Sequence, residues 1–82
     1  MKQVICINDY NLPLGANITK DTTYTVIQEY LNMLDQKVYI LKETINEGYT
    51  KMGMKWTGYN AERFAEINIM SAALTNYEMA LN

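Results

Sequence analysis

Residues 51–64 (KMGMKWTGYNAERF) constrain the fold of this chain more than any other stretch does. They hold its only Trp, its only Arg and its only Phe. Met52, Met54 and Trp56 stand at alternate positions, and a period of two is typical of a strand with one buried face. The spacing predicts a strand over residues 50–56, and with it a mainly β fold whose sheet covers that apolar face.

The neighbouring residues predict how the sheet continues. Thr57-Gly58 favours a tight turn, because Gly accepts the positive φ that such turns often need, and residues 60–64 then form a short closing strand. Further strands are predicted upstream at residues 2–7, 24–28 and 37–42. Residues 2–7 are apolar on both faces, which predicts a strand covered on both sides. Both a helical turn and a bulge fit residues 30–34.

A long loop is predicted between the first two strands. Residues 8–17 (NDYNLPLGAN) are rich in turn-forming residues. Tyr10, Leu12 and Leu14 are the apolar members of this stretch, and we expect them to pack the loop against the sheet. Because long ordered loops often carry function, this segment is the first place to look for a site.

The period changes after residue 67. Met70, Leu74, Tyr77 and Leu81 recur at helical spacing and predict an amphipathic α-helix within residues 68–82. Two arrangements are compatible with this stripe: it packs on the sheet, or it projects and pairs with a second copy or with a partner. Pairing with a second copy would make the chain a self-assembling structural protein, such as a homodimer, which is the alternative interpretation of its function. The chain is therefore interpreted as a single domain, 1–82, with a β-barrel in residues 1–67 and a helix in residues 68–82.

Composition excludes several function classes. The 82 residues carry a net charge of −2, one Cys and no His. Without His, and with a lone Cys6 in an apolar strand, most metal sites, disulfide scaffolds and imidazole chemistry are excluded. We expect no cofactor, no metal and no membrane segment, and a cytoplasmic location.

An enzyme is not expected, because the carboxylates are scattered and no phosphate-binding loop motif occurs. Nucleic-acid binding is a weaker alternative. It would need the basic residues to gather on one face, against the acidic balance of the chain. The residues in question are Lys37, Lys42, Lys51, Lys55 and Arg63.

The order of several short motifs resembles the small, mostly uncharacterised SH3-like β-barrel proteins of bacteria, phages and mobile elements. The matching stretches are residues 4–8 (VICIN), 20–26 (KDTTYTV), 39–41 (YIL) and 59–64 (YNAERF). The resemblance implies an SH3-like barrel of about five strands, and it implies no activity, because such folds host many functions. SH3 domains bind proline-rich ligands in an aromatic groove, but the Pro of their closing motif is replaced here by Asn60 or Ala61.

A protein–protein interaction module is the function that these features favour. Tyr10, Trp56 and Tyr59 are predicted to anchor a partner, because Tyr and Trp are enriched at interface hot spots. Arg63 is predicted to orient an acidic group of that partner. Trp56 also fits a core position, and this choice stays open. The resemblance suggests a phage or mobile-element accessory protein that acts on a host or viral protein.

Overall fold

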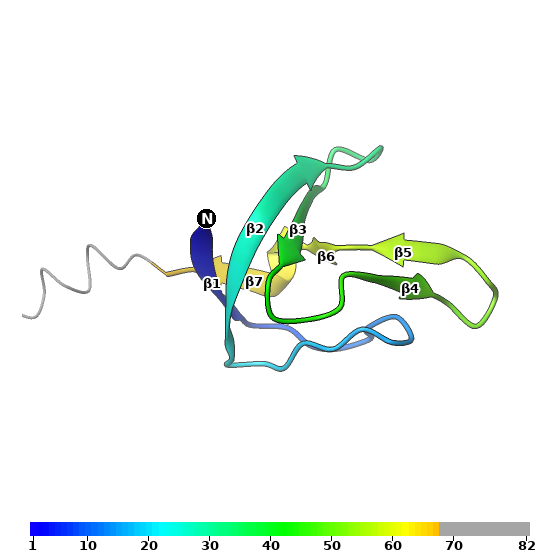
Figure 1. Cartoon of the computed structure of the whole chain (residues 1–82), viewed down its shortest axis with the longest axis horizontal. Coiled ribbons are helices and arrows are strands. Elements are labelled where there is room, and N and C mark those ends of the chain that lie inside the picture. The colour runs from blue at the N-terminus through cyan, green and yellow to red at the C-terminus, as the bar shows by residue number, and fades with distance from the viewer. Residues whose placement is uncertain (68–82) are drawn as a thin grey trace, which may run out of the picture.

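The structure, a computed structural model, describes residues 1–67 (Figure 1). Within them lie seven strands and one short 3-10 helix: β1 (Lys2–Cys6), β2 (Thr23–Leu31), β3 (Lys37–Leu41), β4 (Glu47–Tyr49), β5 (Lys55–Thr57), β6 (Tyr59–Asn60), η1 (Ala61–Arg63) and β7 (Phe64–Glu66). The helix expected over residues 68–82, with Met70, Leu74, Tyr77 and Leu81, lies outside the described residues. The prediction of a mainly β fold is confirmed.

Five strands form one curled antiparallel sheet in the order β6-β3-β2-β1-β7. Figure 1 shows this sheet wrapping into a half-barrel, with β2 following the curve. The pairing of β2 with β3 shifts register between Val26 and Gln28, so a β-bulge bends the strand at this point. Residues 30 and 31 continue β2 in extended form. The bulge therefore lies earlier than expected, and no helical turn follows it.

The concave side of the sheet holds the core. Its buried members come from every strand of this sheet and from the loop after β1: Val4, Cys6, Ile18, Tyr24, Val26, Tyr39, Leu41, Tyr59 and Phe64. The Phe64 ring lies 5.8 Å from the Tyr39 ring and 6.2 Å from the Tyr24 ring, at the spacing of aromatic pairs. Ile7 is 48% exposed, so the prediction that residues 2–7 are covered on both faces is wrong.

The strand predicted over residues 50–56 is a turn and a short strand instead. Residues 46–58 form a β-hairpin, which we call the arm, and it projects from the half-barrel (Figure 1). At its tip the Gly53 N–H donates to the Thr50 carbonyl (2.9 Å), with Gly53 at φ 82°. Met52 and Met54 are 89% and 67% exposed. Alternation was misleading here because exposed methionines gave the same pattern as buried ones.

Gly58 and Asp35, two residues with positive φ, lie between strands. Gly58 has the positive φ (68°) that the Thr57-Gly58 pair indicated, but the chain only bends there, between β5 and β6, so the predicted tight turn is wrong. Asp35 has φ 60° in the turn between β2 and β3. The Asn32 side chain closes this turn by accepting from the Leu34 N–H (2.8 Å) and the Gln36 N–H (3.0 Å).

The arm is joined to the half-barrel through Asn46. Its side-chain oxygen accepts from the Leu41 N–H, and its side-chain nitrogen donates to the Leu41 carbonyl, both at 2.7 Å. The amide thus replaces a strand partner where β3 leaves the sheet. The Asn46 carbonyl then accepts from the Gly58 N–H, so the start and the end of the arm are tied together.

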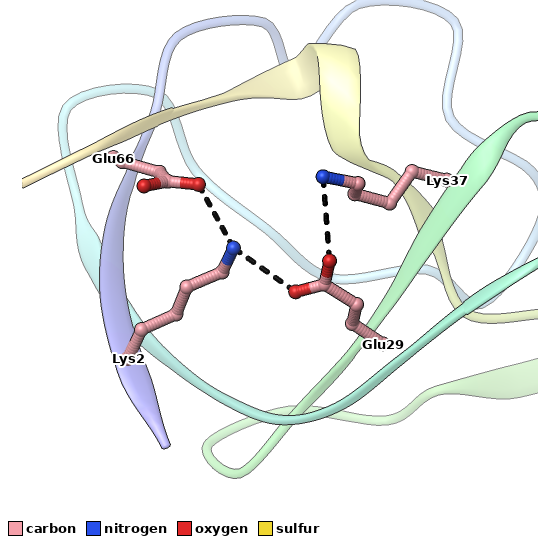
Figure 2. A network of polar contacts seen from close by, with 4 residues as sticks. All are labelled: Lys2, Glu29, Lys37 and Glu66. Atoms are coloured by element: carbon pink, nitrogen blue, oxygen red, sulfur yellow. Dashed lines mark hydrogen bonds and ion pairs between the residues drawn. The ribbon is translucent and has the colours of Figure 1, made fainter.

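A row of four charges crosses the concave side at one end of the core (Figure 2). Lys37 on β3 pairs with Glu29 on β2 (3.3 Å), Glu29 pairs with Lys2 on β1 (3.0 Å), and Lys2 pairs with Glu66 on β7 (2.8 Å). The signs alternate strand by strand. The Lys2 ammonium also lies 5.0 Å from the centre of the Tyr39 ring, so the row rests on an aromatic member of the core.

The charge row and Glu43 together make the stability of the fold depend on pH, at both acid and alkaline pH. The hydrogen bond from Lys2 lowers the pKa of Glu29, and a hydrogen bond from the Thr25 N–H lowers the pKa of Glu43. Hydrogen bonds to Glu66 and Glu29 raise the pKa of Lys2. The carboxylate contributions are present above the ordinary glutamate value of about 4.3 and are lost as pH falls below it. The Lys2 contribution is present below about 10.4 and is lost above it.

We therefore expect a melting temperature that is flat between these limits and falls at acid pH. In Glu29→Gln the melting temperature at neutral pH should drop slightly, and the acid-induced fall should be smaller than in the wild type. Thermal unfolding followed by circular dichroism across the pH range checks both. An acid-induced fall of equal size in the two proteins would show that Glu29 does not contribute.

Candidate functional site

A long loop, residues 7–22, connects β1 to β2. Of the four residues predicted to anchor a partner, Tyr10 lies in this loop and the other three form hydrogen bonds to it. Ordering the backbone costs about 1–2 kcal/mol per residue, so an ordered loop of this length needs many contacts to hold it. Side chains from the arm, from β6 and from η1 provide several of them. The candidate site is therefore built from this loop and the groups that fasten it.

Arg63 holds the first part of the loop. Its Nη1 donates to the carbonyls of Tyr10 (2.8 Å) and Asn8 (3.2 Å), and its Nη2 lies 3.5 Å from the Asn11 carbonyl. Asn11 has φ 55°, so the chain turns sharply at this point. The guanidinium faces main-chain carbonyls of its own chain, whereas the prediction was that it orients an acidic partner group. Arg63 shapes the loop.

Trp56 holds the tip of the loop. Its Nε1 donates to the Leu14 carbonyl (3.0 Å), and its ring lies 5.7 Å from the Tyr59 ring. The indole lies across Gly48, its cross-strand partner, where an added Cβ would come within 2.7 Å of Nε1. Trp56 is half-buried against the edge of the core. It therefore combines the core and surface positions that the sequence left open.

Tyr59 holds the return of the loop from inside the core. It is 2% exposed, so the prediction that it is a surface anchor does not fit its position. Its hydroxyl donates to the Ile45 carbonyl and accepts from the Asn17 N–H (3.2 Å). A phenol in the core thus fixes the main chain of two loops at once.

Further polar contacts complete the fastening. The Tyr24 hydroxyl accepts from the Thr19 N–H (2.9 Å), and an Asp9 carboxylate oxygen accepts from the Lys20 N–H (3.0 Å). Ile18 is buried in the core at 4% exposure. Contacts therefore follow the loop over its whole length.

Tyr10 and Leu14 are the most exposed large apolar side chains of this loop. They are 75% and 59% exposed, whereas Leu12 is half-buried against the core. The prediction that all three pack on the sheet is correct for Leu12 alone. Leu14 was not predicted as a site residue. Residues two apart in an extended chain share a face, so the local pattern carried no signal that Leu12 and Leu14 differ in exposure.

Residues 1–67 also bear on metal binding, on the Cys6 thiol and on membrane crossing. No group of three His, Cys, Asp or Glu side chains in this range could hold a metal ion. Burial raises the pKa of the Cys6 thiol, as expected for a small residue that serves as core. Within the same range, no helix has the length and apolar character needed to cross a bilayer.

Three of the five basic residues named for nucleic-acid binding contact groups of the chain itself. Lys37 pairs with Glu29, Lys55 pairs with Glu47 (3.4 Å), and Arg63 contacts the loop.

Comparison of the chain with protein-family models, with curated proteins and with solved structures gave no match.

Proposed function

We propose that this chain is a non-catalytic protein-binding module whose contact surface is the loop of residues 7–22. The observation that carries the proposal is a contrast between the main chain of the loop and two of its side chains. Its main chain is held by Arg63, Trp56 and Tyr59, while the side chains of Tyr10 and Leu14 stay exposed. A loop that is ordered before binding loses less conformational entropy when it docks.

The fold supports this proposal at a general level. A five-strand antiparallel sheet with a long loop between its first two strands is what the SH3-like barrel leads one to expect. We therefore propose an SH3-like barrel, and a role as a phage or mobile-element accessory protein that acts on a host or viral protein. A fold of this kind does not by itself specify the target.

The arm extends the proposed surface beyond the loop. Trp56 bonds to the Leu14 carbonyl, and Met54, which is 67% exposed, comes immediately before β5. Methionine side chains are flexible and adapt to irregular partner surfaces. Leu14, Trp56 and Met54 thus offer an apolar strip, which favours a protein partner over nucleic acid.

The proposal predicts that the double variant Tyr10→Ala/Leu14→Ser remains folded and loses its partner. Truncating hot-spot residues commonly costs more than 1–2 kcal/mol, so affinity should fall at least about tenfold. A pull-down from nuclease-treated host lysate would identify the bound protein, and titration calorimetry with that purified protein would measure the loss.

The matched control is Met33→Ala/Leu34→Ser. These two residues are also exposed, at 100% and 77%, but they lie in the turn between β2 and β3. The control should bind like the wild type. Equal losses in both double variants, or full binding by the loop variant, would contradict the proposed site.

A further inference from the structure

Within residues 1–67, β7 is an edge strand of the five-strand sheet. The Ile7 N–H donates to the Arg63 carbonyl (2.8 Å), and the Ile67 N–H donates to the Gln3 carbonyl (3.2 Å). In an antiparallel pair, alternate residues point their N–H and C=O groups at the partner, so Phe64 and Glu66 point theirs away from β1. The Phe64 N–H is used by η1. Within residues 1–67, no hydrogen bond occupies the N–H or C=O of Glu66.

The charge row of Figure 2 ends at this same edge. From β3 to β7 its members are Lys37, Glu29, Lys2 and Glu66, so the signs run plus, minus, plus, minus. Glu66 is the most exposed of the four, with 63% of its side chain accessible. Lys2 contacts Oε2 of this carboxylate. A positive charge on a strand beside β7 would continue the alternation.

We propose that the β7 edge binds an extended basic segment of a partner protein, which adds to the sheet as a sixth strand. Its main chain would pair with the N–H and C=O of Glu66. A Lys or Arg side chain would lie beside the Glu66 carboxylate, since opposite charges on neighbouring strands stabilise a sheet. This mode of recognition is β-strand addition.

A second copy of the chain does not match this edge. If two β7 strands paired antiparallel about Glu66, the two carboxylates would lie opposite each other, and like charges in that position are destabilising. If they paired about Ala65, each Glu66 would face Phe64 of the other copy, and no cation would meet the carboxylate. The charge pattern therefore selects a basic partner. This surface is separate from Tyr10 and Leu14, so the inference goes beyond the proposed function.

The probe is a blocked pentapeptide, Thr-Val-Thr-Lys-Thr, titrated into the isotope-labelled full chain and followed by NMR. We expect shifts of the Ala65, Glu66 and Ile67 amides, and slower hydrogen exchange at the Glu66 N–H as it becomes bonded. The counterpart with Glu in place of Lys should bind about tenfold more weakly, because it sets like charges side by side. A peptide N-methylated at its central amides keeps its charge but cannot extend a sheet, and it should not bind.

Charge reversal in the protein distinguishes pairing at Glu66 from non-specific electrostatic attraction of a basic peptide to the chain. Glu66→Lys should reverse the preference between the Lys and Glu peptides, whereas Glu62→Lys, an equal change on the nearby η1, should leave it as in the wild type. Equal binding of the two peptides, binding of the N-methylated peptide, or no saturable shift at β7 would overturn the proposal. So would the same shifts on raising the protein concentration without peptide, because these would assign the edge to a second copy.

Discussion

Replacing Gly58 with Ala is expected to lower the free energy of unfolding by about 2–4 kcal/mol. Gly58 has φ 68°, a conformation that costs an L-residue roughly 1–2 kcal/mol. An added Cβ would also overlap the Val38 Cγ1 methyl and lie 3.0 Å from the Tyr39 carbonyl oxygen. The backbone oxygen is held in β3, so the crowding cannot be relieved by a side-chain rotation alone.

Gly53→Ala is the matched control. Gly53 has φ 82°, but nothing lies within 4 Å of an added Cβ, so this variant should show only the backbone cost. Urea denaturation of both variants would separate conformational strain from crowding. Equal losses in the two would contradict the close approach of Gly58 to β3.

Tyr59→Phe is expected to lower the free energy of unfolding by about 1–3 kcal/mol, although it removes a single oxygen atom. The change leaves the Asn17 N–H and the Ile45 carbonyl without their partner in a partly buried site. The ring stays the same, so packing against Trp56 and Phe64 is retained. The loss should therefore report on the fastening of the loop.

Tyr10→Phe removes the same atom from a side chain that is 75% exposed, and it should leave stability unchanged. Denaturant titration of both variants, with hydrogen exchange at the Asn17 amide, makes the comparison. The Asn17 N–H should exchange faster in Tyr59→Phe only. If the two variants were equally stable, the hydroxyl of Tyr59 would not be holding the loop.

The sheet could be predicted from the sequence because its signals are local. The residue pattern in residues 24–28 and 37–42 identified β2 and β3, and Gly58 was identified as a residue that takes a positive φ. The arm could not be predicted in the same way. Met52 and Met54 alternate as strand residues do, and only the bonds within the tip show that the chain reverses there.

The role of the site residues depended on contacts that no local pattern contains. Trp56 and Tyr59 lie 42 positions from the loop residues that they hold, and Arg63 lies 53 from Tyr10. Residue type predicted these side chains to be partner anchors. It could not show that they bind their own chain rather than a partner. Asn46, which joins the arm to β3, carried no signal beyond its place in a turn-forming stretch.

The most direct test of the account is the backbone order of the loop, measured by 15N relaxation on the full chain. If Arg63, Trp56 and Tyr59 hold residues 8–20, their order parameters should be about 0.85, as in the strands. Values below about 0.6 in this segment would describe a flexible loop. That result would contradict the central claim, that the loop is fixed before any partner binds.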